Sequence, residues 1–443
     1  MDFIPHTPED IREMLTVIGV ERVEELFSDI PLHLRLSRLL DLPSPLTEQE
    51  LTRKMEAIRE GNRLPGLCLT GAGAYHHYIP AAVRHLIGRS EFYTAYTPYQ
   101  AEISQGILQA IYEYQTMVLS LTGMEVTNAS MYDGATAMAE ACLMAIKMNN
   151  LPQIIVSRAV HPEYRKVLMT YAGAYGCEVK EAPFGGDGRT DLRALETLVG
   201  KETAVLVIQN PNFFGVLEDL AALCQLKRMK GVLLSVVFTE ALSLALLKSP
   251  GQMGADLVAG EGQSFGIPLN YGGPYLGILA ATRAFIRRMP GRIVGATKDG
   301  EGKRGYVLTL QAREQHIRRE KATSNICSNE TLCALAASIY LSLMGKNLKK
   351  LAELNVKRAH YLMKRLSELK GWGRMFNTPF FNEFVMRTPD SREVMERLQG
   401  AGVMGGYPLD GDYPELKGGI IFCVTEMVTR REMDWVVSLL ERG

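Results

Sequence analysis

The sequence predicts an α/β protein whose largest domain is built on a mainly parallel sheet. Two features carry this prediction: strand-like and helix-like segments alternate between residues 153 and 259, and a glycine-lined loop follows the last of these strands. A chain of 443 residues exceeds the ~250 to 300 residues that one core supports, so several domains are expected. We expect a helical arm over residues 1–65, a large sheet domain over 66–328 and a small C-terminal α/β domain over 329–443.

The glycine-lined loop is the first candidate for a ligand site. A short apolar strand, Leu257–Ala259, is followed by glycines and two prolines as far as Gly277. Glycine allows positive φ or close approach of a second group, and in α/β sheets ligands bind where the strands end. A structural crossover without a ligand explains these residues equally well.

Composition excludes several classes of function. Lys plus Arg equals Asp plus Glu, 49 each, so the net charge indicates neither nucleic acid nor an anionic membrane, and association with another protein stays open. The 7 cysteines are scattered without a CxxC spacing, which argues against a disulfide scaffold or zinc site. No secretory signal begins at Met1, and the apolar tract 231–247 is shorter than the ~20 residues of a spanning helix. We expect a cytoplasmic protein.

The arm should contain three helices. Thr7 and Pro8 are typical of a helix start and Gly19 of its end. A short helix with Val23, Leu26 and Phe27 should follow, and Thr47 should begin a third that runs towards Gly61.

Residues 71–80, GAGAYHHYIP, contain candidate binding residues. They lack the third glycine and the preceding strand of a dinucleotide fingerprint, so we reject that interpretation. His76 and His77 have no neighbouring cluster of His, Cys or carboxylates, so we expect no metal site. The next loop holds Tyr93, Tyr96 and Tyr99, which suit an interface or pocket rim, although a turn packed on its own domain is equally common.

A long helix is expected over 102–121. A turn of small residues follows over 128–137, and a second helix is expected over 139–148. Such a turn offers an anion site at a helix N-terminus, although plain helix caps are far commoner. Strands follow over 153–157, around 178–179, over 204–208 and over 232–238, with helices after Pro162 and over 191–198. A charged helix is expected over 311–321. The C-terminal domain should have helices over 331–343, 354–369, 391–398 and 431–440, with strands over 384–387 and 419–424.

Six distinctive segments are spread through the chain. They are GAGAYHHYIP, EFYTAYTPYQAEISQG, ASMYDGATAMAEA, QNPNFFG, GEGQSFGIPLNYGGPYLG and REQHIRREKATSNIC. Together they resemble the glycine decarboxylase P-protein family of the glycine cleavage system, in particular its separate N-terminal subunit (subunit 1, alpha), over residues 1–443. The resemblance implies a fold-type I pyridoxal-phosphate enzyme fold.

One departure from a pyridoxal enzyme decides the expected role. Such an enzyme needs a lysine that holds the cofactor as a Schiff base, and in this chain that place falls at Gln263 or Ser264, with no lysine between Lys248 and Lys298. The rest of a vestigial cofactor pocket is expected at Asp133, Gly134, His161 and Glu240. We therefore expect pyridoxal phosphate on a homologous, lysine-bearing partner subunit, and the isolated chain to be inactive.

The resemblance also implies the reaction of the complex. Glycine is decarboxylated on pyridoxal phosphate, and the aminomethyl group passes to the lipoyl arm of H-protein, within an oxidoreductase expected to be a heterotetramer. A rim shared with the partner's active site is expected from seven residues: Tyr75, His76, His77, Tyr96, Thr97, Tyr99 and Gln100. Two alternatives are a structural pseudoenzyme scaffold and a self-sufficient aminotransferase-like enzyme, and the missing lysine argues against the second.

Overall fold

The computed structural model describes residues 5–36, 38–93 and 97–441 and divides the chain into two compact units, Met1–Leu64 and Pro65–Gly443. In the first unit, α1 (Pro8–Ile18) begins with a reciprocal capping box between Thr7 and Asp10 and ends at Gly19 in the left-handed region. The short helices η1 (Val23–Phe27) and η2 (Leu32–Leu34) follow, and α2 (Glu48–Glu60) is capped by Thr47. The three predicted helices are confirmed. The division of residues 66–443 into two domains stays a prediction.

The second unit is built on a mixed seven-stranded sheet. Its strand order is β2 (Val126–Thr127), β8 (Gly277–Ala281), β7 (Leu257–Glu261), β6 (Leu233–Phe238), β5 (Thr203–Gln209), β3 (Gln153–Ser157) and β4 (Glu178–Ala182). Neighbours from β7 to β4 are parallel, whereas β8 is antiparallel to both β7 and β2. The mainly parallel sheet is confirmed, and the β8 strand was not predicted.

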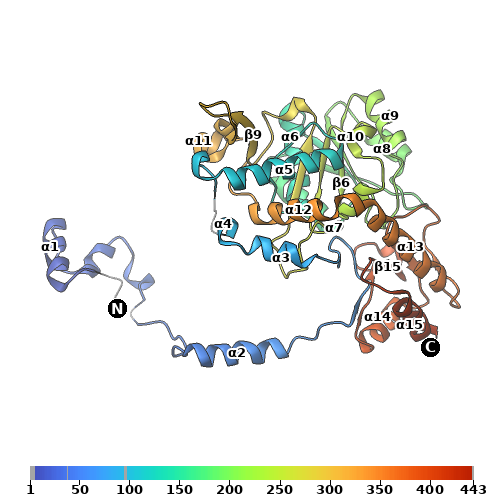
Figure 1. The fold of residues 1–443 in the computed structure, drawn as a ribbon, viewed down its shortest axis with the longest axis horizontal. Helices are drawn as coiled ribbons and strands as arrows, with labels where there is room; N and C mark the ends of the chain where they lie inside the picture. Colours follow the sequence, from blue (N-terminus) through green and yellow to red (C-terminus); the bar gives the residue numbers. More distant parts are fainter. Residues whose placement is uncertain (1–4, 37, 94–96, 442–443) are drawn as a thin grey trace. The chain divides into compact units, whose positions relative to one another are not determined.

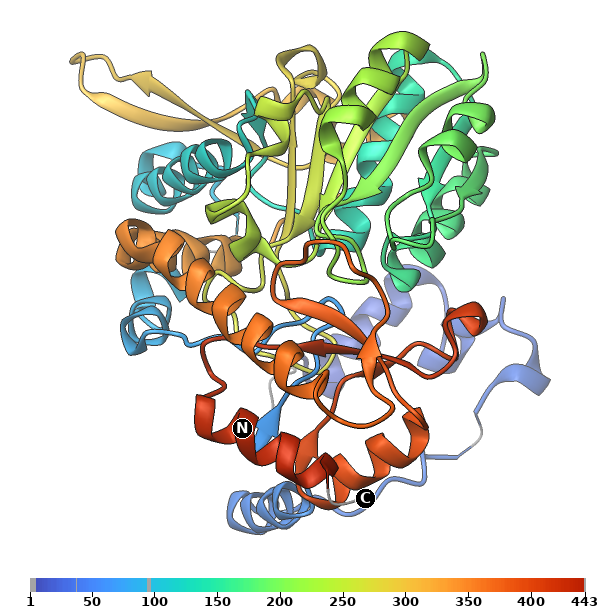
Figure 2. The same cartoon turned by 90° about the vertical axis from the view of Figure 1, so that its right-hand side faces the viewer.

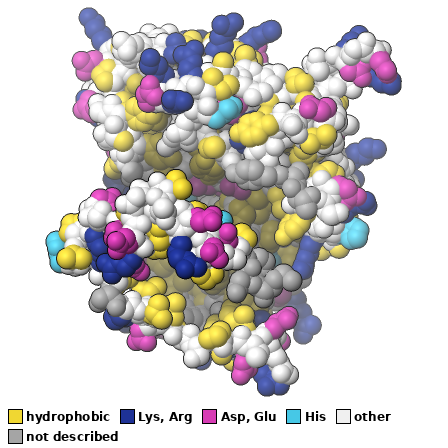
Figure 3. Space-filling view, turned by 90° about the vertical axis from the view of Figure 1, so that its left-hand side faces the viewer, with side chains coloured by type: hydrophobic (Ala, Val, Ile, Leu, Met, Phe, Trp, Pro, Cys, Tyr) yellow, Lys and Arg dark blue, Asp and Glu magenta, His cyan; other side chains and the backbone are white. Residues whose placement is uncertain are grey.

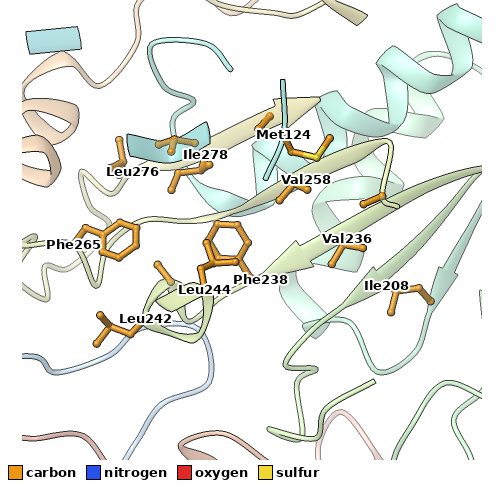
Figure 4. Packing of buried hydrophobic residues seen from close by; sticks show 14 of the residues in the cluster. Met124, Ile208, Val236, Phe238, Leu242, Leu244, Val258, Phe265, Leu276 and Ile278 are labelled. Carbon is orange, nitrogen blue, oxygen red and sulfur yellow. The ribbon is translucent and has the colours of Figure 1, made fainter. Parts of the chain in front are cut away.

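Alternate residues along the strands face opposite layers of helices. Val236, Phe238 and Val258 pack on one side with residues from α5 (Gln105–Thr122), α9 (Leu220–Lys230) and α12 (Thr331–Met344), as Figure 4 shows for part of this core. Val237, Leu257 and Ala259 face the other side, towards α6 (Gly134–Asn149) and α7 (Pro162–Ala174). Both faces are covered, which explains why the strands are continuous apolar runs. The α8 helix (Leu192–Leu198) also contributes to the first side.

Short elements lead into this sheet. The α3 (Ala81–Ile87), α4 (Ser90–Tyr93) and η3 (Ala101–Ile103) segments precede α5, and η4 (Ala241–Ala245) and α10 (Pro250–Met253) connect β6 with β7. In Figure 1, α12 runs beside α5 and α3, in agreement with their contacts. Residues far apart in the sequence thus cover one side of the sheet.

The C-terminal part contains a four-stranded antiparallel sheet. Its order is β11 (Gly373–Arg374), β12 (Glu383–Arg387), β15 (Gly419–Cys423) and β14 (Tyr407–Pro408). Helices α13 (Leu348–Leu366), α14 (Ser391–Gly400) and α15 (Arg430–Glu441) share an apolar core with it (Figure 2). β1 (Leu67–Cys68) pairs with β13 (Val403–Met404), so the chain passes along this part before it enters the large sheet.

Two expectations about helices were wrong, and one hairpin was not predicted. The α6 helix begins at Gly134, not at Ala139, because Asp133 caps it. The charged run 311–321 is broken into η6 (Gln311–Arg313), α11 (Gln315–Arg318) and η7 (Arg319–Lys321), with Arg319 at φ 53°. β9 (Ile293–Lys298) and β10 (Arg304–Thr309) form a hairpin that the sequence did not reveal.

Charge and hydropathy of the described chain carry little information about a membrane. Acidic and basic side chains are both scattered over the face in Figure 3. One helical segment, Thr331–Leu366, is long and apolar enough to cross a membrane by length and composition, but half of its most apolar window is buried inside the fold. A buried core helix passes the same test, so cytoplasmic location remains a prediction.

Candidate functional site

Segment 71–80 is tied to the carboxyl ends of the central strands. Tyr75 donates its backbone N–H to Gln263 Oε1 over 2.9 Å, and Gln263 Nε2 donates to the Tyr75 carbonyl over 3.0 Å. The Tyr75 hydroxyl donates to Glu383 Oε2 over 2.8 Å and lies 2.9 Å from Thr239 Oγ1. Since Thr239 follows β6 and Glu383 begins β12, the segment joins the edges of the two sheets.

His77 is buried between two carboxylates. Its Nε2 lies 2.9 Å from Glu240 Oε2, and its Nδ1 lies 2.9 Å from Glu426 Oε2. Both ring nitrogens can donate only in the imidazolium form. Burial alone would lower the pKa of His77, but the two carboxylates outweigh it and raise the pKa to about 10. The site therefore holds a buried cation at neutral pH.

A third acid, Glu383, lies beside Tyr75. Glu383 accepts the Ala72 backbone N–H at 2.6 Å as well as the Tyr75 hydroxyl. Burial nevertheless raises its pKa to about 7. The carboxyl ends of the strands are thus filled by a polar network that belongs to this chain alone.

A cavity of about 550 Å³ lies beside the N-terminus of α6 and is bordered by Ala72, Gly73 and Ala74 of segment 71–80. Its charged and aromatic lining residues include Asp133, His161, Tyr164, Glu261, Tyr275 and Glu330. Asp133 caps α6 and His161 caps α7, and Glu261 ends β7. The starts of two helices and the end of β7 therefore meet at this cavity. The glycine-lined loop that follows β7 predicted a ligand site at this place.

Glu261 occupies the anion position at the start of α6. Its carboxylate accepts the backbone N–H groups of Gly134, Gln263 and Leu276 at 3.0, 3.1 and 2.9 Å. Burial raises its pKa to about 8, although these three bonds act in the opposite direction. The chain thus supplies its own carboxyl group where a free helix N-terminus would bind an external anion.

The imidazole of His161 forms part of the cavity wall in its neutral form. Its Nε2 donates to the Ala72 carbonyl over 2.8 Å, and its Nδ1 accepts the Glu163 backbone N–H over 3.1 Å. Burial lowers the pKa of His161, which agrees with that neutral tautomer. The ring packs against Phe213 and Tyr164 with centroid distances of 4.8 and 5.1 Å.

The six residues predicted for a vestigial cofactor pocket lie in two adjoining places. Asp133 and His161 line the cavity, and Gly134 borders it through its N–H. Glu240 and Gln263 lie instead in the polar network around His77 and Tyr75. Ser264 is buried, and its Oγ has no hydrogen-bond partner among the described residues.

The residues predicted for a shared rim are also divided. Tyr75 and His77 are buried, whereas His76, Tyr99 and Gln100 are exposed and Thr97 is half-buried. Tyr96 lies outside the described residues. Tyr75 and His77 use their polar atoms on internal partners, and the rim shared with the partner stays a prediction.

Sequence reasoning missed Tyr132, Tyr164, Glu261 and Glu330 as residues of the cavity. Glu261 had a signal: it is the one carboxyl inside a glycine-rich strand end. Glu330 had no such signal in the sequence. It directly precedes α12, and only the fold brings it to the start of α6, which lies nearly two hundred residues earlier in the chain.

The fold defines the class of protein. The chain resembles a Burkholderia pseudomallei sphingosine-1-phosphate lyase with a TM-score of 0.65 at 17% identity, covering 93% of this chain and 94% of that one. A NifS-like protein matches with a TM-score of 0.64 at 14% identity, covering 85% and 98%. This is the fold of the fold-type I pyridoxal-phosphate enzymes.

The family follows from closer matches. The model of the glycine cleavage system P-protein family matches residues 1–440. The probable glycine dehydrogenase (decarboxylating) subunit 1 of Moorella thermoacetica is 54% identical over 99% of both chains, and that of Desulforamulus reducens is 52% identical over the same share. A crystal structure of a glycine decarboxylase (P-protein) in inhibitor-bound form matches with a TM-score of 0.88 at 43% identity, covering 100% of both chains. The chain belongs to the P-protein family.

The residues of this chain do not fit pyridoxal phosphate. No described residue that lines the cavity is a lysine or an arginine, and the strand after Glu240, β7, ends at Glu261 and is followed by Gly262 and Gln263. The Gly134 N–H, which could hold a phosphate at the start of α6, is already bound to Glu261. Covalent attachment and a phosphate anchor are therefore both missing here.

The buried His77 pair predicts a specific dependence of stability on pH. The pKa of His77 is raised from 6.5 to about 10 on folding, so its contribution is fully present below pH 6.5 and is lost as the pH rises towards 10. We expect His77→Gln to lower the free energy of unfolding by about 3 to 5 kcal/mol at pH 6, because it leaves buried carboxylates unpaired. The difference from the wild type should shrink as the pH rises, as measured by urea unfolding at several pH values.

The exposed neighbour provides the control. His76→Gln should change the free energy of unfolding by less than about 0.5 kcal/mol at each pH. A His77→Gln penalty that is constant from pH 6 to pH 10 would contradict a buried imidazolium.

Proposed function

We propose that this chain is subunit 1 of a glycine dehydrogenase (decarboxylating) and acts only together with a homologous, lysine-bearing subunit 2. The complex decarboxylates glycine and transfers the aminomethyl group to the lipoyl arm of H-protein. The observation that carries this proposal is the full-length match, at 54% identity over 99% of both chains, to a relative of that name. The relatives' names favour an enzyme subunit over a purely structural scaffold.

The pyridoxal phosphate of the complex is held by the partner in this proposal. Gln263 stands where a cofactor lysine is needed, and its side chain is fixed by Tyr75 and by the Ile267 carbonyl. The cofactor supplies an electron sink for the decarboxylation. This chain lies beside the partner's active site in the complex, and its residues are not required to hold the cofactor. Because Gln263 stands in place of that lysine, the chain is not expected to be a self-sufficient aminotransferase-like enzyme.

The exposed loop around Tyr99 suits contact with the partner. Tyr99 is 49% exposed, yet the buried Arg292 donates from Nη2 to its hydroxyl over 3.2 Å and lies 5.4 Å from its ring centroid. The His316 ring packs edge-on at 5.5 Å. An exposed aromatic side chain that is already ordered loses little entropy on binding, so Tyr99 is a preorganised contact for the partner's active site.

Exposed apolar residues in the first unit also support association. Val17, Leu32 and Leu39 are 88%, 80% and 92% exposed, and many other large apolar side chains of Met1–Leu64 are exposed as well. Apolar surface of this extent is typical of a protein interface.

Co-expression tests the proposed assembly. The chain alone should self-associate or be unstable and should not turn over glycine, because it exposes its interface and lacks the cofactor lysine. Together with the lysine-bearing subunit it should give a stable hetero-oligomer that decarboxylates glycine. Size-exclusion chromatography combined with release of labelled carbon dioxide measures both. Stable monomers that do not bind that subunit would contradict the proposal.

Replacing one hydroxyl tests the role of Tyr99. Tyr99→Phe keeps the ring, so assembly should persist, while turnover of the complex should fall about tenfold to a hundredfold if the hydroxyl serves the transition state. Tyr93→Phe, at a side chain that is 70% exposed, is the matched control and should leave turnover unchanged. Normal turnover in both variants would favour the scaffold.

A further inference from the structure

We propose that the cavity at the N-terminus of α6 binds a small organic ammonium cation. The inference goes beyond the proposed function, because it concerns a site that this chain forms alone, whatever reaction the complex performs. The N-terminus of a helix ordinarily favours an anion, and the acidic residues at the start of α6 favour a cation instead.

The cavity has an acidic lining. Asp133, Glu261 and Glu330 all contribute to its wall, and none of the described lining residues is a lysine or an arginine. Glu330 donates its backbone N–H to Ser130 Oγ, and no described donor is bound to its carboxylate. His161 adds no positive charge, because both of its nitrogens are used in the neutral form. A cation that enters therefore meets the carboxylate of Glu330, which has no described donor, beside Asp133 and Glu261.

An anion is excluded for the same reason. Glu261 already accepts the Gly134 N–H, and its second oxygen accepts from Gln263 and Leu276. A phosphate at the start of α6 would have to displace that carboxylate and lie beside Asp133. The carboxylates of the wall therefore attract a cation and repel an anion, and both effects favour a cationic ligand.

Tyr164 is a second, independent indication of a ligand. Its side chain is only 8% exposed and lines the cavity, and its hydroxyl has no hydrogen bond to any described residue. The hydroxyl lies directly over Gly134, where a Cβ would come within 2.2 Å of it, so only glycine fits there. A mostly buried side chain whose hydroxyl opens on the cavity without a described partner favours a ligand that accepts or donates a hydrogen bond there.

Aromatic rings favour an organic cation over a metal ion. Tyr132, Tyr164 and Tyr275 all line the cavity, and their faces attract ammonium groups. No group of three or more His, Cys, Asp or Glu in the described parts of the chain is arranged to hold a metal ion. A volume of about 550 Å³ accommodates a small amine together with water.

The site should bind cations more tightly at alkaline pH. Titratable groups that face Glu261 are Asp133 on α6, Tyr114 on α5, Tyr164 on α7, Tyr275 before β8 and Cys333 on α12, and none is cationic. With a pKa of about 8, Glu261 is mostly neutral at pH 7 and mostly ionised at pH 9. Ionisation adds one negative charge to the wall.

Calorimetric titration of the full-length chain with tetramethylammonium tests the proposal, since the charge of this probe does not change with pH. We expect saturable binding at one site per chain, about tenfold tighter at pH 9 than at pH 7. Neopentyl alcohol, a neutral and water-soluble molecule with the same branched core and one added hydroxyl, should not bind. Inorganic phosphate and pyridoxal phosphate should not compete with the cation.

Three variants locate the site. Glu330→Gln should weaken binding about tenfold at both pH values, and Glu261→Gln should remove the pH dependence. Glu163→Gln removes the same charge from α7 at a side chain that is 66% exposed and outside the cavity, so it should leave binding unchanged. Absence of binding by the wild type, equal weakening by Glu163→Gln and Glu330→Gln, or competition by phosphate would each overturn the proposal.

Discussion

The buried imidazolium of His77 is the interaction on which the arrangement of the second unit depends. Its two ring nitrogens contact Glu240, which follows a strand of the large sheet, and Glu426, which follows a strand of the small sheet. Asn382 donates to the same Glu240 oxygen over 3.1 Å, so a third element is tied in. A charge that is removed from water is tolerated only when its partners stay in place, which fixes segment 71–80 across both sheet edges.

This constraint explains why the expected cofactor pocket is divided. The oxygens of Glu240, which was expected in the vestigial cofactor pocket, accept hydrogen bonds from His77, Asn382 and the Leu242 N–H. The side-chain amide of Gln263 forms two hydrogen bonds with the backbone of Tyr75. What remains open is the cavity beside α6, whose wall is acidic. The chain has the fold of a fold-type I enzyme, and its own side chains bind one another at Glu240 and Gln263, two of the positions predicted for the cofactor pocket.

Local signals predicted most of the fold but only part of the site. The strand 153–157 and the capped starts at Thr7 and Thr47 were found because apolar runs and capping residues act over a few neighbours. The β9–β10 hairpin was missed, and the broken run 311–321 was read as a helix, because side chains such as Arg313, which donates to the Gly291 carbonyl, are placed by distant partners. The burial of His77 and the approach of Glu330 to Asp133 depend on tertiary packing, so no local pattern announces them.

The central claim is that this chain shares the reaction of the complex without holding the cofactor. Its most direct test is borohydride reduction of the complex with pyridoxal phosphate, followed by mapping of phosphopyridoxyl peptides by mass spectrometry. The account predicts one modified lysine on the partner subunit and none on this chain, whether the partner is present or absent. A phosphopyridoxyl group at one defined lysine of this chain, accompanied by glycine turnover without the partner, would contradict it.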